Sequence, residues 1–300
     1  MKTNLTIIIL LSILPLTICC EGEKGDDDTN DRTIRLNAGV TTLHSKAAIT
    51  EGSFDATVAG WESASSTPDY TSTPTWVSAP TTITIGSTNN LTLQENPQYN
   101  TDNSVKTFIT AWYPQGIPSE AIIPISSLQG EVDVMYAKTI SGSLGNKIKQ
   151  PLTFNHLLTQ FKFIVAKSSG WDDAQKLQSI TIDNARLPKS LHVGTGTITY
   201  SSSASLVIPS ITDQTLSTTP KQVGTAVMIA PVTGNTLPLT IVTNNGTQEQ
   251  TFQVSATTDD TDYMPGKAYS VTLTFNDKNI SISATVTPWQ EGTASGSVTL

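Results

Sequence analysis

Residues that catalyse reactions or bind metals are scarce in this sequence. Cysteine occurs only at Cys19 and Cys20, at the end of an apolar N-terminal run, so no disulfide can brace the rest of the chain and the fold must depend on its hydrophobic core. The three histidines, His44, His156 and His192, are not spaced with one another, with cysteine or with acids as a zinc site requires. For His156, a structural role at a domain junction is favoured over a catalytic one.

The motifs of common enzyme classes are also missing. There is no Gly-x-Ser-x-Gly nucleophile turn and no phosphate-binding loop, and nothing points to paired catalytic carboxylates. Charged residues make up only 14% of the chain and the net charge is −8, which argues against a nucleic-acid partner because phosphates require a basic face. We therefore expect no enzymatic activity, no cofactor and no nucleic acid.

One acidic cluster has the chemistry of a metal site. Asp259, Asp260 and Asp262, in the stretch TTDDTDY, carry the carboxylates that calcium prefers, but their spacing differs from that of an EF-hand loop. A solvated turn is the favoured interpretation, and calcium binding is the alternative. No other metal site is expected.

Alternation of apolar and polar residues is the dominant pattern that is present. It is clearest near the C-terminus, where apolar residues alternate with serine or threonine in Tyr269–Phe275 and Ile280–Val286. A period of two predicts two half-buried strands, and Asn276–Asn279 between them has the length of a hairpin loop. Helical patterns are almost absent, and the abundance of Thr, Ser, Val and Ile, with 37% hydrophobic residues, is typical of a folded all-β protein.

Other runs predict strands along the whole chain. Thr107–Tyr113 predicts a central strand, and Thr225–Ala230, which is apolar on both faces, predicts another. Asn245-Gly246 is the strongest short hairpin signal, between Leu237–Val242 and Thr251–Ala256.

The first strand is expected at Thr33–Leu43, TIRLNAGVTTL, with a break at Gly39. Its apolar side chains are Ile34, Leu36 and Val40, which we expect to cover apolar residues of the first domain.

The N-terminus has the pattern of a lipoprotein signal. Lys2 gives a positive start, and Leu5–Leu16 is almost wholly apolar but too short to span a bilayer comfortably. The paired cysteines at its end predict a lipobox, with lipidation at Cys20 and Cys19 as the alternative. The stretch that follows, EGEKGDDD, predicts a solvated tether.

The length favours two β-domains of ordinary size over one large domain. We expect a signal peptide at residues 1–19, an acidic flexible tether at 20–32, an N-terminal β-sandwich at 33–150 and a C-terminal β-sandwich at 151–300. Two sandwiches in tandem fit the strand pattern better than one barrel.

Several short motifs, taken in order, resemble the fimbrillin family of type V pilus subunits. Asp133–Ala137, DVMYA, is followed by Phe154–Leu158, FNHLL, and a hydrophobic strand. A Gly-Lys-x-Tyr at Gly266–Tyr269 leads into one terminal strand, and Val-Thr-Pro-Trp at Val286–Trp289 closes the next. The resemblance covers most of the chain after the signal.

The resemblance implies two tandem transthyretin-like β-sandwich domains in a fimbrial subunit, structural or adhesive at the tip. It implies an outer-membrane lipoprotein of the cell surface and fimbrium, whose partners are other fimbrial subunits, the membrane through a lipid anchor, and host or bacterial surface ligands. Subunits of this family join by strand addition at a groove that is opened when a protease cuts after an arginine behind the first strand.

Here the basic residue in the expected loop is Lys46, whereas Arg32 and Arg35 precede or lie within the strand. We therefore expect processing at Lys46, with Arg35 as a less favoured position. A tip, anchor or accessory subunit is as well supported as a stalk subunit.

The alternative function is a surface glycan-binding lipoprotein that forms no polymer. It would share the lipobox, the tether and the sandwiches, and it would require exposed tryptophans in one plane. Trp112 lies in an apolar strand and is expected in the core, whereas the surroundings of Trp61, Trp76 and Trp171 leave both a core position and a sugar platform open.

Overall fold

The computed structural model describes residues 31–40, 52–85, 88–276 and 280–287, with the backbone alone for 282–287. The chain divides by its internal contacts into Met1–Asp31 and Arg32–Leu300, and every strand described below lies in the second unit. The protein is all-β, and the described residues contain no helix.

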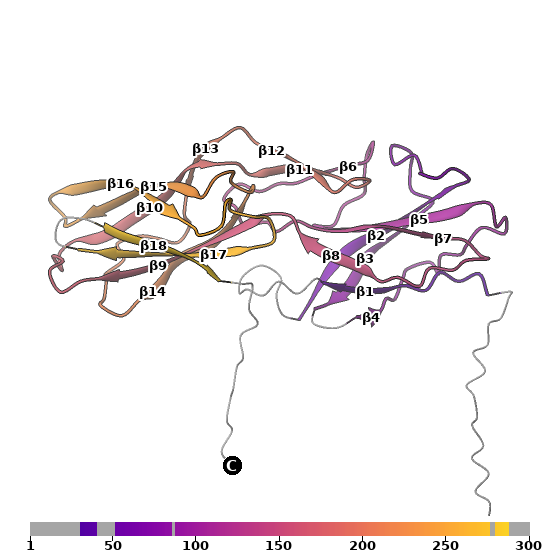
Figure 1. The fold of residues 1–300 in the computed structure, drawn as a ribbon, viewed down its shortest axis with the longest axis horizontal. Coiled ribbons are helices and arrows are strands. Elements are labelled where there is room, and N and C mark those ends of the chain that lie inside the picture. The colour runs from indigo at the N-terminus through magenta and orange to yellow at the C-terminus, as the bar shows by residue number, and fades with distance from the viewer. Residues whose placement is uncertain (1–30, 41–51, 86–87, 277–279, 288–300) are drawn as a thin grey trace, which may run out of the picture. The chain divides into compact units, whose positions relative to one another are not determined.

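The first half of this unit is dominated by a seven-stranded sheet (Figure 1). Only β1 and β8 run parallel; the other neighbours are antiparallel. Its strands, in spatial order, are β3 (Trp76–Thr84), β2 (Ser53–Ser63), β5 (Lys106–Tyr113), β7 (Met135–Gly142), β8 (Leu152–His156), β1 (Asn37–Val40) and β4 (Asn89–Asn90). The predicted central strand at Thr107–Tyr113 is confirmed, because β5 lies between β2 and β7.

Both faces of this sheet are buried. On β5, Ile109 and Ala111 belong to one core cluster, which also contains the side chains of β1, while Trp112 belongs to a second cluster on the opposite face. A three-stranded sheet contributes to this second cluster through Ile123 and Leu191; it consists of β12 (Thr197–Tyr200), β11 (Pro188–His192) and β6 (Ile122–Pro124).

Strands from both sides of residue 150 share sheets. β8 follows this position in the sequence and pairs with β7 and β1, and β11 pairs with β6. The division into 33–150 and 151–300 remains a prediction, and two of the sheets contain strands from both sides of it.

The second half forms a sandwich of two four-stranded sheets around one core. One sheet has the order β14 (Lys221–Ile229), β9 (Thr159–Lys167), β17 (Ala268–Phe275) and β18 (Ile280–Thr287). The other has the order β13 (Ala204–Val207), β10 (Lys176–Ala185), β15 (Thr236–Asn244) and β16 (Glu249–Thr257).

The two predicted hairpins are confirmed. β17 and β18 pair antiparallel from Ala268 opposite Thr287 to Phe275 opposite Ile280, and the apolar side chains of β17 are fully buried while its threonines are half-buried. β15 and β16 flank Asn245-Gly246, where the positive φ of 88° at Gly246 suits a residue without a Cβ.

The prediction that Thr225–Ala230 is a central strand is wrong. β14 is an edge strand that pairs only with β9. Its second face is nevertheless buried, because Met228 packs into the cluster of Trp61 and Trp112, and the Met228 amide donates to the Gly130 carbonyl at 2.7 Å. The second apolar face of β14 therefore reflects packing against this cluster and does not indicate a strand on each side of β14.

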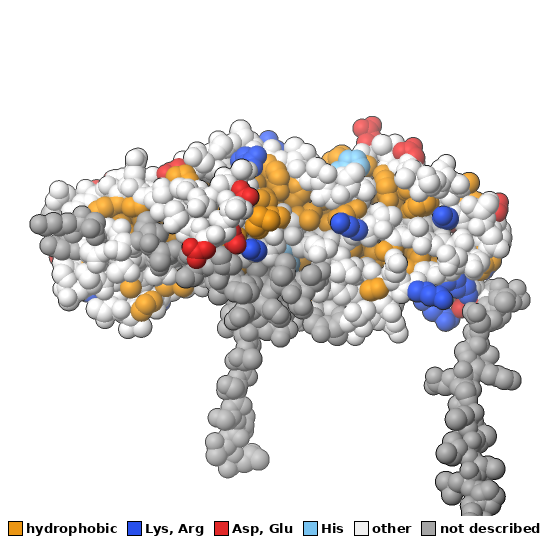
Figure 2. All heavy atoms as spheres, in the orientation of Figure 1, with side chains coloured by type: hydrophobic (Ala, Val, Ile, Leu, Met, Phe, Trp, Pro, Cys, Tyr) orange, Lys and Arg blue, Asp and Glu red, His pale blue; other side chains and the backbone are white. Residues whose placement is uncertain are grey.

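The described surface carries few charges. Figure 2 shows Lys, Arg, Asp and Glu side chains scattered among larger uncharged areas, as expected for a chain with 14% charged residues.

Candidate functional site

The first strand of the fold is an interior strand of the seven-stranded sheet. On one side β1 runs parallel to β8, with Ala38 opposite Leu152 and Val40 opposite Phe154. On the other side it runs antiparallel to β4, with Asn37 opposite Asn90. A segment only a few residues long is therefore enclosed by neighbours on both flanks.

Its side chains enter the core as an extended segment requires. Ile34, Leu36 and Ala38 are 3%, 3% and 1% exposed, and they share a cluster with Phe54 and Phe154. The prediction that Ile34 and Leu36 cover apolar residues is confirmed, and Val40 is half-buried against the same cluster. Ala38 was not singled out from the sequence, although the period of two that selects Ile34 and Leu36 also selects Ala38.

The start of this segment is tied to the loop that follows β4. The Arg32 guanidinium donates to the Tyr99 carbonyl from Nε at 2.9 Å and from Nη2 at 2.6 Å, and the Tyr99 amide donates to the Arg32 carbonyl. The Tyr99 hydroxyl accepts from the Ile148 amide at 2.8 Å, and burial raises the pKa of Tyr99. Arg32 and Tyr99 together hold the segment that leads into β1 against this loop.

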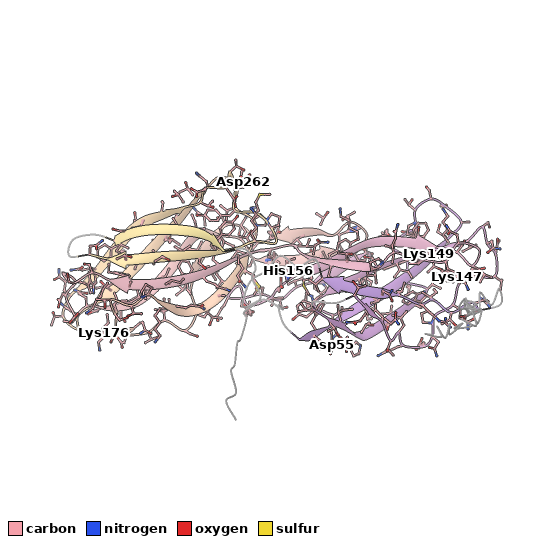
Figure 3. The ribbon with its side chains drawn as sticks, turned by 60° about the horizontal axis from the view of Figure 1, so that its bottom comes forward. Asp55, Lys147, Lys149, His156, Lys176 and Asp262 are labelled. Atoms are coloured by element: carbon pink, nitrogen blue, oxygen red, sulfur yellow. The ribbon has the colours of Figure 1, made fainter. Side chains whose placement is uncertain are left out.

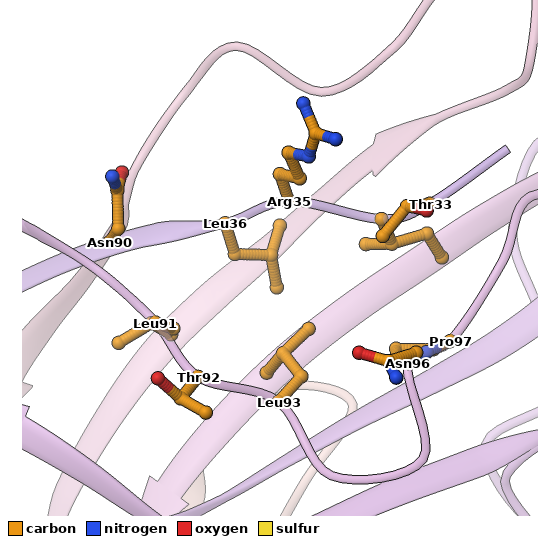
Figure 4. Close-up of a pocket in the computed structure, with 10 residues that line it drawn as sticks. Thr33, Arg35, Leu36, Asn90, Leu91, Thr92, Leu93, Asn96 and Pro97 are labelled. Carbon is orange, nitrogen blue, oxygen red and sulfur yellow. The ribbon is translucent and has the colours of Figure 1, made fainter. Parts of the chain in front are cut away.

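A pocket opens beside the same segment. Its volume is about 350 Å³, and its lining comes from Thr33–Leu36, from Asn90–Leu93 and from Asn96 and Pro97. Figure 4 shows the side chains of Leu36 and Leu93 pointing toward each other across it, while the Arg35 side chain points away. We call it the Leu36–Leu93 pocket.

The two sequence motifs of the middle region meet in one buried pair. His156 Nδ1 lies 2.7 Å from Asp133 Oδ2, and both side chains are 4% exposed. The pairing of β7 with β8 places Met135 opposite His156, and burial, with the Asp133 charge adding to it, raises the pKa of the neighbouring Tyr113. Neither member of the pair lines the Leu36–Leu93 pocket, and their burial supports the structural interpretation of His156.

Two of the three acids of the calcium hypothesis bind groups of their own chain. Asp260 Oδ2 accepts from Lys267 Nζ and from the Tyr269 hydroxyl, each at 2.9 Å, and Asp262 Oδ1 accepts from the Gly234 amide at 2.7 Å. The hydrogen bond from Lys267 lowers the pKa of Asp260. Within the described residues no three His, Cys, Asp or Glu side chains are grouped as a metal site would need, so these contacts give calcium binding no support. Figure 3 shows Asp262 well apart from His156.

The tryptophans do not form a sugar platform in the described part of the chain. Trp61, Trp112 and Trp171 are 2%, 0% and 7% exposed. Trp76 is half-buried and lies over Gly60, where an added Cβ would clash with its ring. Trp289 lies outside the described residues.

The remaining predicted positions fall in two groups. Cys19, Cys20 and Lys46 lie outside the described residues. Arg35 is described, and it lies exposed between the buried Ile34 and Leu36. In the part of the chain that is described, no helix has the length and apolarity needed to cross a membrane.

One comparison with known proteins shows the family. The sequence profile of the fimbrillin-like family matches residues 54–289. A search of curated proteins finds no match.

Solved structures share the fold. A protein assigned to cell adhesion from Bacteroides uniformis superposes with a TM-score of 0.58 at 15% identity, covering 86% of this chain and 98% of that one. A second, from Bacteroides ovatus, has a TM-score of 0.52 at 15% identity, with 86% and 98% covered. A fimbrial protein from Bacteroides vulgatus has a TM-score of 0.52 at 13% identity, with 86% and 100% covered. Since the profile spans well over half of the sequence, the chain belongs to the fimbrillin-like family.

Proposed function

We propose that this protein is a fimbrial subunit, in the stalk or as a tip or accessory adhesin, that is exported as an outer-membrane lipoprotein and joins other subunits by β-strand donation. The observation that carries the proposal is the position of β1, the first strand of the chain, inside a sheet whose other strands come from residues 53–156. Membership of the fimbrillin-like family and the shared fold of the Bacteroides vulgatus fimbrial protein support the pilus context and the cell surface.

The energetics of the segment Ile34–Val40, which ends in β1, suit an exchangeable strand. Ile34 and Leu36 are almost fully buried, and each such side chain contributes about 1.5–3 kcal/mol when it is removed from water. Without β1, the backbone groups of β8 and β4 that pair with it and the apolar core beside it would face water, which is costly for both. A strand from another subunit would pair with the same backbone groups and cover the same apolar residues. Binding of an extended strand in the vacated groove is therefore strongly favourable.

The geometry also distinguishes the two processing positions. Arg35 lies before Leu36 and β1, so a cut after Arg35 would leave Leu36–Val40 attached to the subunit and the groove filled. A cut at Lys46 would separate the whole strand. We therefore propose Lys46 as the processing position.

Processing is tested by a cut that mimics it. Residues 44–50 are replaced by the recognition site of a sequence-specific protease, and the purified protein is examined by gel filtration and electron microscopy before and after cleavage. We expect the cut subunits to polymerise, or to aggregate once the strand has left, whereas the uncut variant stays monomeric under the same conditions. A cut protein that loses residues 20–43 and remains a stable, soluble monomer would show that β1 guards no groove.

The lipid anchor is tested at the two cysteines. Changing both Cys19 and Cys20 to serine should abolish lipid labelling and release the protein from the membrane fraction, because the lipobox thiol is the acceptor. The two single variants identify the acceptor, and Cys20→Ser is expected to have the full effect. Membrane retention of the double variant at the wild-type level would contradict lipoprotein export.

A further inference from the structure

The Leu36–Leu93 pocket exists because the ladder beside the first strand is interrupted. At one end the Leu91 amide donates to the Leu36 carbonyl at 2.8 Å, and at the other the Ile34 amide donates to the Pro97 carbonyl at 2.8 Å. One residue lies between Ile34 and Leu36, whereas five lie between Leu91 and Pro97. The segment that faces the strand therefore has four more residues than a regular ladder would hold, and it bows outward.

The bowed segment is fixed in place by a different strand. The Gln94 amide donates to Ser78 Oγ of β3 at 2.9 Å, and Ser78 Oγ is 2.8 Å from Thr81 Oγ1. Both hydroxyl-bearing residues are buried, at 0% and 1% exposure. Because Gln94 finds its acceptor on β3 instead of on the first strand, the opening is held by specific contacts.

We propose that the Leu36–Leu93 pocket is the place where a β-strand of a second copy of this chain first docks, before β1 leaves. This inference rests on the proposed strand donation and names the step at which it begins. The pocket binds the leading apolar side chain of the incoming strand, whose backbone then displaces β1 residue by residue toward Val40.

The surroundings of β1 single out this position. Ala38–Val40 are paired with β8, and Asn37 and Ala38 are paired with β4, so a new strand cannot reach the groove there without first breaking backbone hydrogen bonds. At the pocket the ladder beside the segment is already interrupted, and the lining includes the apolar residues Leu36, Leu91 and Leu93. A volume of about 350 Å³ is at the small end of the range for ligand sites, about 300–1,000 Å³, and suits side chains better than a large ligand.

The lining of the pocket is mixed. It includes the apolar side chains of Leu36, Leu91 and Leu93, and its one charged residue, Arg35, directs its side chain away (Figure 4). The other polar residues of the lining are uncharged: Thr33, Asn90, Thr92 and Asn96. An extended chain with alternating apolar and polar side chains, as the strands of this protein have, offers both kinds of group to such a surface.

The proposal has a kinetic signature. If the incoming strand docks while β1 is in place, the rate of exchange rises in proportion to the concentration of the incoming strand. If β1 must leave first, the rate equals that of its departure and does not depend on that concentration.

The experiment uses the full-length protein cut at the engineered protease site in residues 44–50. A fluorescent peptide with the sequence of Thr33–Leu43 serves as the incoming strand, and its incorporation is followed by fluorescence anisotropy over a series of peptide concentrations. We expect a rate that rises linearly with peptide concentration in the wild-type background.

Variants that fill the pocket sharpen the test. Leu93→Trp should slow incorporation about tenfold, the factor expected when the burial of one apolar side chain is lost, and leave the final amount of bound peptide unchanged. Thr92→Trp fills the pocket from an exposed residue of its lining and should also slow incorporation. If Leu93→Trp lowers the melting temperature of the uncut protein, the rate measured for Thr92→Trp is the test of the docking pocket. Leu128→Trp, at a site that is 83% exposed and outside the pocket lining, is the matched control and should exchange at the wild-type rate.

The outcomes separate the two proposals. A rate that is independent of peptide concentration, or wild-type rates in both filled variants, would overturn the docking pocket while strand exchange stands. Failure of every variant, wild type included, to incorporate the peptide after complete cleavage would overturn strand donation itself, and the pocket with it.

Discussion

The two halves of the molecule hold their interior strands in different ways. In the second half, β17 pairs with β9 along Ala268–Phe275 and with β18 over the same length, and its five apolar side chains are fully buried. In the first half, the described residues of β1 pair with β8 over Ala38–Val40 and with β4 at Asn37 and Ala38. Within β1 only Ala38 is fully buried, whereas the buried Ile34 and Leu36 lie just before the strand. The main-chain ladder of β1 is also shorter than that of β17 within the described residues.

This difference separates a permanent strand from a replaceable one. Burial of apolar side chains stabilises a strand without specifying which chain supplies it, whereas a long ladder must be broken pair by pair before the strand can leave. A strand with a short ladder over an apolar groove is held firmly by side-chain burial, but only a few backbone hydrogen bonds must break before another strand can replace it. We therefore expect the two halves to respond differently when their interior strands are perturbed.

The largest expected effect follows deletion of residues 32–43. Loss of Ile34 and Leu36 alone removes about 3–6 kcal/mol of burial, which is comparable with the whole stability margin of a domain, about 5–15 kcal/mol. Hydrogen exchange should show loss of protection in β2, β5, β7 and β8, with protection retained in β9, β15 and β17.

Addition of the Thr33–Leu43 peptide in trans is the control for this deletion, and it should restore the lost protection. A deletion variant in which β5 and β7 stay as protected as in the full-length protein would remove the distinction between the two halves.

A smaller effect is expected at the buried pair beside the junction of β7 and β8. His156→Ala leaves the Asp133 carboxylate buried without its partner, and removal of one member of a buried pair costs about 3–5 kcal/mol. The second Asp133 oxygen, Oδ1, already lacks a hydrogen-bond partner within the described residues, so no group is in place to compensate.

Urea denaturation measures the cost of His156→Ala, and His192→Ala is the matched control because His192 is only half-buried. The replacement of both pair members, Asp133→Leu with His156→Leu, should recover much of the loss, because no buried charge then remains. Equal destabilisation by His156→Ala and His192→Ala would contradict the structural role of the pair.

Much of the fold could be predicted from local pattern. The alternation in Tyr269–Phe275 reports one buried and one half-buried face directly, and the Asn-Gly turn at Asn245 fixes a hairpin through local geometry. The failures are non-local. Thr225–Ala230 is apolar on both faces because Met228 packs against residues distant in the sequence, and a linear pattern does not say whether a face is covered by a strand or by a loop.

The candidate site was predictable in part for the same reason. The alternation of Ile34 and Leu36 showed that the first strand is buried, but its place between β8 and β4 depends on pairing with residues far along the chain. The Leu36–Leu93 pocket has no sequence signal, because it arises from a register difference between two segments and from the hydroxyl of Ser78 on a third. The contact of Asp133 with His156 likewise required the pairing of β7 with β8.

The smallest expected effect concerns the turn before β17, where an exposed ion pair supports the permanent strand. Asp260 accepts from Lys267 and from Tyr269, and these hydrogen bonds lower the pKa of Asp260 below its ordinary value. A carboxyl whose pKa is lowered by folding stabilises the folded state above its ordinary pKa, and this contribution disappears as pH falls through the lowered value.

Because the pair is partly exposed, Asp260→Asn should cost at most about 1 kcal/mol at neutral pH, and the difference from wild type should vanish in acid. Thermal unfolding from neutral pH to pH 3 measures this dependence, with Asp259→Asn as the control because the neighbouring Asp259 is exposed to solvent. If Asp260→Asn lowered the free energy of unfolding by several kcal/mol, β17 would depend on this one turn. The second half would then resemble the first, because its interior strand would be held by few contacts.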